Sequence, residues 1–185
     1  MKYTDKFVAI ASEERSSRFK VITLVVGATL FLVVFAWLVL WISHWLVDVF
    51  NTLFVEPLPV VGGVIAAIGA AVAGWTALVM WMQAEGTPAP LAPTRKLVVS
   101  GPFRYCRNPM QLGMMIYLLG LGTAFFSLVT GLVALLVAFA VGGSYHHFIE
   151  EKELRARFGE EYEQYRRGTP FLIPRCKRAG GPAED

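Results

Sequence analysis

Three long stretches of the chain contain no Asp, Glu, Lys or Arg, and all three are predominantly apolar: residues 21–42, 58–82 and 110–148. An α-helix rises about 1.5 Å per residue, so each of the first two stretches matches the hydrocarbon thickness of a bilayer. As a single helix the third would measure roughly 58 Å, about twice that thickness. It must therefore fold back, and we expect the turn near residues 127–131.

The pattern predicts an all-α fold: a polytopic membrane helix bundle of about four transmembrane helices, with the third and fourth joined in a hairpin. Asn108 and Pro109 are residue types preferred at the N-cap and the first position of a helix, and we expect them to begin the third. The fourth helix should continue into a cytoplasmic helical segment as far as Gly159 or beyond, because no Gly or Pro interrupts it. The expected spans are residues 21–42, 58–82, 109–127 and 130–149.

Residues 1–185 are expected to form one membrane domain, in which residues 150–174 lie in the cytoplasm and residues 175–185 are a flexible tail. The second helix has a small residue at every fourth position. This stripe predicts a face on which another helix packs closely. Its members are Gly62, Ala66, Ala70 and Gly74.

The basic residues predict the orientation. In a four-span topology all 17 Lys and Arg lie before the first span, between the second and third, or after the fourth. Lys and Arg are enriched on the cytoplasmic side of membrane proteins. We therefore expect a multi-pass protein of a bacterial inner membrane with both termini in the cytoplasm. The net charge of +3 is then an orientation signal, and no nucleic-acid partner is expected.

Composition excludes several classes of protein. The chain is 55% hydrophobic and 17% charged, whereas soluble domains are about 45–50% apolar and 25% charged. No span has an acid or base at its middle, which argues against an ion-coupled transporter, and His44 is expected at the outer interface. Cys106 and Cys176 fall on the cytoplasmic side, where a disulfide is disfavoured, and their spacing does not fit a metal site.

Polar residues gather at the cytoplasmic ends of the third and fourth helices, in residues 95–113 and 146–151. These clusters offer cations, carboxylates, aromatic rings and a helix N-terminus that can bind an anion. Glu150 and Glu151 can hold an ammonium or a sulfonium. A ligand with both a carboxylate and a cation, such as S-adenosylmethionine, would suit them. Solvated charges that only set the topology would fit nearly as well.

Two motifs in these clusters resemble a known family. Residues 101–113 read G-P-F-R-Y-C-R-N-P-M-Q-L-G, similar to the G-x-Y-x-x-x-R-[HN]-P-x-Y-x-G motif of the isoprenylcysteine carboxyl methyltransferases. Residues 150–165, followed by Pro170, resemble that family's second motif, whose Glu-Glu pair the related phospholipid N-methyltransferases share. The resemblance covers roughly residues 95–174. It implies a cytoplasm-facing S-adenosylmethionine pocket, closed by the hairpin and residues 150–174, with a lipophilic substrate entering from the bilayer.

Roles for individual residues follow from the resemblance and from side-chain chemistry. His146, one helical turn before Glu150, would serve the substrate, and either residue can take a proton from an acceptor. Arg107 can bind a carboxylate or a headgroup phosphate, while Tyr162 and Tyr165 are expected as packing or lid residues. The implied cofactor contacts are Arg95, Lys96, Leu97, Val98, Phe103, Asn108, Pro109, Met110, Gln111, Glu150 and Glu151.

Four positions depart from the family pattern. Asn108 stands where His is more usual, Phe103 and Gln111 stand where Tyr is common, and His146 replaces Arg. Asn108 can still hydrogen-bond and cap a helix. Histidine titrates near neutral pH, so the charge on the substrate side becomes pH-dependent. This favours a bacterial relative with a substrate other than a prenylcysteine carboxylate.

We therefore expect an S-adenosylmethionine-dependent integral membrane methyltransferase. Its substrate would be lipophilic and membrane-delivered, with a carboxylate, as in isoprenylcysteine, or a thiol. N-methylation of a phospholipid amine is the alternative within the same fold, and a non-enzymatic membrane scaffold or transporter subunit is the alternative of another class. The expected partners are this substrate and membrane lipids. The residues alone decide neither the acceptor nor the oligomeric state.

Overall fold

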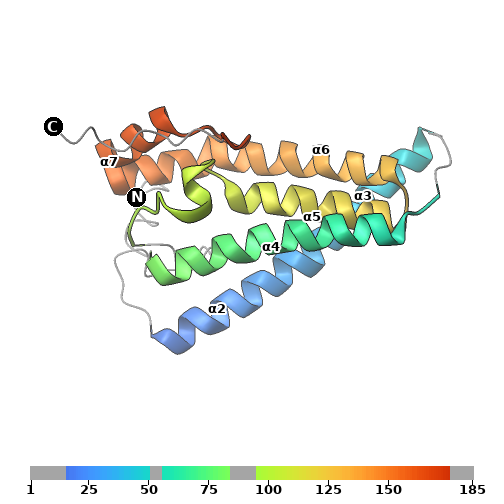
Figure 1. Cartoon of the computed structure of the whole chain (residues 1–185), viewed down its shortest axis with the longest axis horizontal. Coiled ribbons are helices and arrows are strands. Elements are labelled where there is room, and N and C mark those ends of the chain that lie inside the picture. The colour runs from blue at the N-terminus through green and yellow to red at the C-terminus, as the bar shows by residue number, and fades with distance from the viewer. Residues whose placement is uncertain (1–15, 51–55, 84–94, 176–185) are drawn as a thin grey trace. The chain divides into compact units, whose positions relative to one another are not determined.

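A computed structural model describes residues 16–50, 56–83 and 95–175 of the chain. Of the expected tail at residues 175–185, Arg175 is described, and residues 176–185 with Cys176 lie outside the described residues. The described part contains no strand, so the all-α prediction is confirmed (Figure 1). In chain order the elements are α2 (Ser17–Thr29), the π-helix η1 (Leu30–Phe35), α3 (Ala36–Val49), α4 (Pro59–Gln83), the 3-10 helix η2 (Gly101–Arg104), α5 (Pro109–Phe125), α6 (Leu128–Tyr145), the π-helix η3 (His146–Glu150) and α7 (Glu151–Gly168).

Helices cover all four expected spans. Three helical stretches of the described chain are long and apolar enough to cross a membrane: Val21–Val49, Pro59–Gln83 and Leu128–Gly168. The third expected span corresponds to α5, a shorter apolar helix of 17 residues that measures about 26 Å. This is the lower limit for a transmembrane helix. The fold is thus a membrane helix bundle, and the number of four crossings stays a prediction.

The chain forms two compact units, each assembled from segments far apart in sequence. The described residues of Met1–Val25, Trp75–Pro109 and His146–Asp185 form the first, which we term the loop unit. Val26–Gly74 and Met110–Tyr145 form the second, the helix unit. Neither is a continuous piece of chain, so the division does not separate two consecutive domains.

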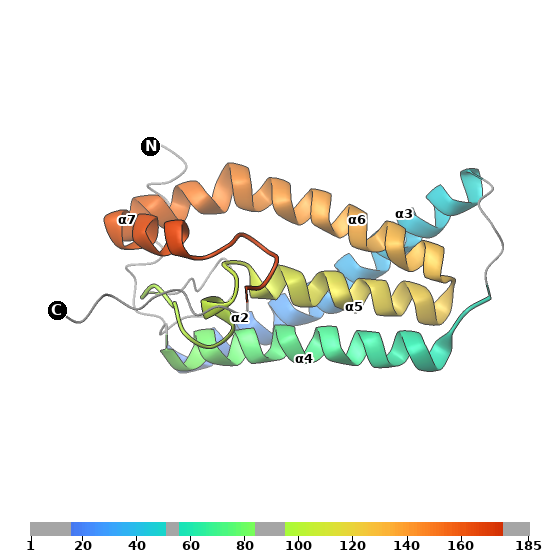
Figure 2. The same cartoon turned by 45° about the horizontal axis from the view of Figure 1, so that its top comes forward.

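In the helix unit, α5 and α6 form the expected hairpin and run side by side in opposite directions (Figure 1, Figure 2). The Thr130 backbone N–H donates to the Ser127 hydroxyl at 3.1 Å, which caps the start of α6. A Cβ on Gly131 would lie 2.5 Å from the Leu119 carbonyl oxygen, so glycine allows the two helices to approach closely. The chain turns at Phe126 and Ser127, so only the first residue of the predicted turn at residues 127–131 lies in it, and residues 128–131 belong to α6.

Small residues also line the contact between α4 and α5 in the helix unit. A Cβ on Gly69 would lie 2.3 Å from the Tyr117 backbone nitrogen, and one on Gly120 would lie 2.2 Å from that of Ala66. The two backbones are therefore in direct contact. The predicted close packing is confirmed at Gly62 and Ala66, whereas Gly69 and Gly120 were not predicted.

The predicted stripe is nevertheless wrong in its second half. Ala70 is exposed, and Gly74 has no atom within 4 Å of an added Cβ. An α-helix has 3.6 residues per turn, so a spacing of four drifts around the helix. Alternating spacings of four and three stay on one face, and the buried positions follow them: Gly62, Ala66, Gly69 and Ala73.

In the loop unit, Val79 and Val98 form a small buried core with Phe103 packed against it. Gly101, beside this core, has a φ of 58°, and a Cβ there would lie 3.1 Å from Val79. Further along, the chain passes from α6 through η3 into α7 without interruption, as predicted. Regular helix breaks within α7 at Gly159, with φ 53° and ψ −127°.

Candidate functional site

The two motifs meet within the loop unit. The Tyr165 hydroxyl of α7 donates to the Phe103 carbonyl oxygen at 2.7 Å, although these residues are 62 positions apart in sequence. The Phe103 backbone N–H in turn donates to the Ser100 carbonyl at 3.1 Å and forms the turn of η2. The second motif therefore holds the backbone of the first.

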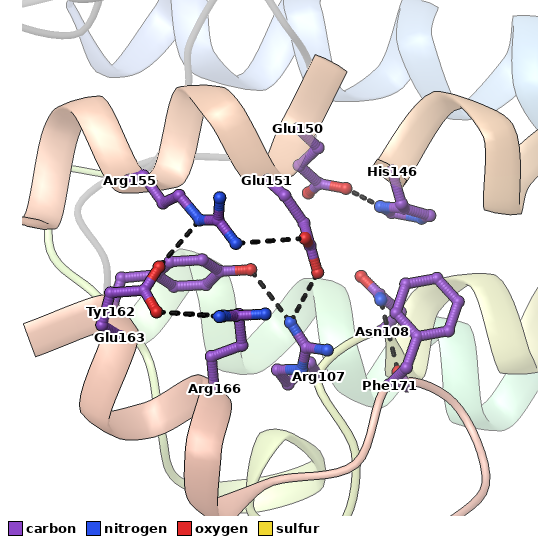
Figure 3. Close-up of polar contacts among 10 residues, drawn as sticks. All are labelled: Arg107, Asn108, His146, Glu150, Glu151, Arg155, Tyr162, Glu163, Arg166 and Phe171. Atoms are coloured by element: carbon purple, nitrogen blue, oxygen red, sulfur yellow. Dashed lines mark hydrogen bonds and ion pairs between the residues drawn. The ribbon is translucent and has the colours of Figure 1, made fainter. Parts of the chain in front are cut away.

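Arg107 lies at the centre of a polar network (Figure 3). Its Nη1 donates to Glu151 Oε1 at 2.7 Å and to the Tyr162 hydroxyl oxygen at 3.2 Å. The two side chains of the ion pair are only 12% and 15% exposed. The Arg107 Nε is buried and has no hydrogen-bond partner among the described residues. Buried N–H groups are normally paired, so this Nε–H is available to donate a hydrogen bond to a ligand oxygen.

The network continues across the break in α7. Arg155 precedes Gly159 and Glu163 follows it, and the Arg155 Nε lies 2.7 Å from Glu163 Oε1. The Arg166 Nη2 donates to Glu163 Oε2 at 3.0 Å. This hydrogen bond from Arg166 lowers the pKa of the Glu163 carboxyl, so the acid stays ionised. These contacts fold the second half of α7 back against the first.

Residues 169–175, which we term the C-terminal strap, run beside the end of the first motif. The Arg107 backbone N–H donates to the Pro170 carbonyl at 2.9 Å. The backbone N–H and the side-chain Nδ2 of Asn108 both donate to the Phe171 carbonyl, at 3.2 and 3.3 Å (Figure 3). The Phe171 ring centroid lies 5.7 Å from the Arg107 guanidinium carbon. The strap thus closes over the polar network.

His146 and Glu150 are the first and last residues of η3, and the His146 Nδ1 contacts a Glu150 carboxylate oxygen (Figure 3). The His146 ring also meets Phe171 edge-on, with centroids 6.1 Å apart. Short π-helical turns are frequent at functional sites. Here the turn brings His146 and Glu150, either of which was predicted to take a proton from the acceptor, beside the strap.

A pocket opens among these elements of the loop unit, with a cavity volume of about 80 Å³. Twelve residues line it: the polar Lys96, Arg107, Asn108 and Glu150, the aromatic Phe103, Phe158, Tyr162 and Tyr165, and the apolar Met80, Leu97, Val98 and Leu154. Cations, a carboxylate and aromatic rings thus share one lining. No group of three or more His, Cys, Asp or Glu in the described chain is arranged to hold a metal ion.

Burial controls the protonation of the pocket's phenols. It raises the pKa of Tyr165, and it raises the pKa of Tyr162 although the Arg107 charge and hydrogen bond oppose it. Burial likewise raises the pKa of the nearby Cys106 thiol. All three stay neutral at physiological pH, so they can hydrogen-bond or pack but do not act as bases.

The pocket gathers part of the predicted cofactor set: Lys96, Leu97, Val98, Phe103, Asn108 and Glu150. Arg95 is exposed, Pro109 is buried at the start of α5, and Glu151 faces Arg107. Met110 and Gln111 belong to the helix unit, where a Cβ on Gly142 would lie 2.5 Å from the Gln111 amide nitrogen. Of the predicted substrate residues, Arg107 lines the pocket and His146 contacts Glu150.

Other lining residues were not expected to be contacts. Phe158, Tyr162 and Tyr165 belong to the second motif, so their positions carried a signal. Met80 carried none, because one more apolar residue near the end of a predicted span does not stand out. Phe171, which contacts Arg107 and His146, likewise lies outside both motifs.

The fold and the pocket define an all-helical membrane protein with a polar site built from two motifs at helix ends. A family model for phospholipid methyltransferases matches residues 59–161, more than half of the chain. The chain therefore belongs to the phospholipid methyltransferase family and is a membrane methyltransferase, which confirms the resemblance seen in the two motifs. No curated protein and no solved structure matches it.

Proposed function

We propose that the protein transfers a methyl group from S-adenosylmethionine to the amine of a phospholipid. The observation that carries this proposal is the shared lining of one pocket. Lys96 and Asn108 from the first motif region and Glu150 from the second lie on the same cavity. This arrangement supplies cationic, amide and anionic groups in one place, as a zwitterionic ligand requires.

The residues present fit this cofactor. Glu150 would hold its ammonium and sulfonium charges, Lys96 its carboxylate, and Phe103 and Phe158 its adenine ring. The buried Arg107 Nε, with no partner among the described residues, offers a further donor for an oxygen. The cavity of about 80 Å³ would enclose only part of the cofactor.

The chain contributes positioning, exclusion of water and proton transfer. When bound, S-adenosylmethionine supplies a methyl group already activated by its sulfonium. The acceptor amine must be neutral, because an ammonium has no lone pair for attack. His146, whose Nδ1 contacts the Glu150 carboxylate, can take the proton that the ammonium gives up. Tyr162 and Tyr165 line the pocket and would help to exclude water once the reactants are bound.

One observation favours the amine over a carboxylate or thiol acceptor: the family match is to phospholipid methyltransferases. The carboxylate and thiol acceptors that the sequence favours remain alternatives, which the product can distinguish.

A bacterial inner membrane with the pocket and both termini on the cytoplasmic side is part of the proposal. The basic residues that flank the pocket support this orientation.

The test is transfer of tritiated methyl from S-adenosylmethionine into the lipids of membranes that contain the protein. We expect the label in a phospholipid, and we expect mild base not to release the labelled methyl group, because an N-methyl bond does not hydrolyse. Release of the label as methanol would instead identify a methyl ester. Label no higher than in membranes with Glu150→Ala would contradict the proposal and favour a non-enzymatic scaffold.

A further inference from the structure

The adjacent residues Glu150 and Glu151 have different partners. Glu150 lines the pocket and contacts His146. Glu151 is not part of the lining, and its Oε1 lies 2.7 Å from Arg107 Nη1 (Figure 3). Successive side chains on a helix point about 100° apart, so the two carboxylates face different surroundings. The pair is therefore not one doubled acidic site.

Arg107 is fixed in place by several contacts. Glu151 and the Tyr162 hydroxyl share its Nη1, the Phe171 ring lies beside it, and its backbone N–H is bonded to the strap. A guanidinium that is only 12% exposed needs a counter-charge, and Glu151 supplies it. The Nε–H is left buried, on a residue that lines the pocket, without a partner among the described residues.

Glu151 is itself held from the other side. Arg155 Nη2 lies 3.8 Å from its second oxygen, and the Arg155 Nε lies 2.7 Å from Glu163, beyond the break in α7. The carboxylate is thus anchored between two arginines. Its negative charge is directed to Arg107 and Arg155, and little of it is left for a ligand cation.

We propose that Glu151 is a positioning residue that acts through Arg107. It holds the guanidinium so that the Nε–H meets an anionic oxygen of a bound ligand, and it does not contact the ligand itself. This inference rests on the proposed function, because the oxygen would come from the carboxylate of S-adenosylmethionine or from the phosphate of a phospholipid acceptor.

The experiment compares the full-length protein with Glu151→Gln, Arg107→Lys and the double variant. Glu161→Gln, an exposed glutamate of the same helix, is the matched control. Arg107→Lys keeps a positive charge for Glu151 but has no Nε–H, so it tests the same donor if Glu151→Gln fails to fold. Calorimetry measures binding of S-adenosylhomocysteine and of 5′-methylthioadenosine, which lacks the carboxylate. Steady-state kinetics with phosphatidylethanolamine vesicles give KM and kcat.

If the oxygen belongs to the cofactor, both single variants should weaken S-adenosylhomocysteine binding by roughly tenfold or more. The affinity for 5′-methylthioadenosine should be unchanged, because this nucleoside lacks the carboxylate. If it belongs to the acceptor, they should raise the acceptor KM by roughly tenfold, with kcat and S-adenosylhomocysteine binding unchanged. In either case the double variant should match Arg107→Lys alone, because Glu151 acts through Arg107.

Three results would overturn the inference. They are an equal loss of affinity for both nucleosides in Glu151→Gln, additive effects of the two substitutions on affinity or KM in the double variant, or no change in any measured parameter. These failures all occur in an active wild-type background. A wild-type protein that binds no S-adenosylhomocysteine and transfers no methyl group would instead refute the proposed function itself.

Discussion

The geometry of the second motif depends on one residue, Gly159. Its φ of 53° and ψ of −127° form a combination that is readily available to glycine alone. The reversal there lets Arg155, before the break, pair with Glu163 after it. It also brings Tyr162 to Arg107. A single backbone conformation therefore connects the ion-pair network to the pocket.

Gly159→Ala should destabilise the protein by about 1–3 kcal/mol, which is the cost of a strained backbone at a non-glycine residue. No atom lies within 4 Å of the added Cβ, so this cost is conformational and not a clash. The measurement is the thermal unfolding midpoint in detergent. Gly143→Ala is the control, since that helical glycine also has open space and alanine favours a helix. Equal midpoints for the two variants would contradict this account.

Asn108 shows what sequence can and cannot predict about a single residue. The motif and the following proline predicted its place before α5, and it does line the pocket. The motif did not predict that its backbone and side chain both donate to the Phe171 carbonyl. A backbone carbonyl can be offered by any residue, so the contact at Phe171 leaves no pattern in the sequence.

At the scale of elements, α4 and α5 pack backbone to backbone in the helix unit. Each helix contributes two glycines seven residues apart to this contact: Gly62 and Gly69 in α4, and Gly113 and Gly120 in α5. Between apolar helices in lipid there is little hydrophobic driving force, so close van der Waals contact provides much of the stabilisation. A side chain at any of these positions would separate the helices.

Gly120→Ala should lower stability by about 1–3 kcal/mol or more through overpacking. The added Cβ would lie 2.2 Å from the Ala66 backbone nitrogen, which cannot move like a flexible side chain. Gly63→Ala, on the adjacent face of α4 with nothing within 4 Å, should leave stability unchanged or raise it slightly. The measurement is the temperature at which each of the two variants aggregates in detergent. A Gly120→Ala protein as stable as Gly63→Ala would rule out this packing.

The helical type and the approximate positions of the long elements were predictable because uninterrupted apolar runs have few alternatives in a membrane protein. Finer features were missed. The predicted stripe failed at Ala70 and Gly74 because a spacing of four drifts around a helix of 3.6 residues per turn. The π-helices Leu30–Phe35 and His146–Glu150 had no sequence signal either. In a π-helix the backbone hydrogen bonds connect residues five apart and not four, and this small change requires no particular residue type.

At the scale of the whole molecule, polarity is arranged as a membrane requires. Ser43, Thr123 and Thr130 are fully or almost fully buried in the helix unit, whereas Trp37 and Trp41 are more than half exposed. A soluble protein with so many exposed large apolar side chains would aggregate, and lipid removes that cost. This distribution of buried polar and exposed apolar side chains agrees with membership of a membrane enzyme family. The orientation that the basic residues predict stays a prediction.

The central claim is that the pocket binds S-adenosylmethionine through Glu150. The most direct measurement is a calorimetric titration of the purified protein with S-adenosylhomocysteine. We expect saturable binding by the wild-type protein, loss of binding in Glu150→Ala, and wild-type affinity in Glu161→Ala, whose exposed side chain lies in the following helix, α7. No binding by the wild-type protein, or unchanged affinity in Glu150→Ala, would contradict the account.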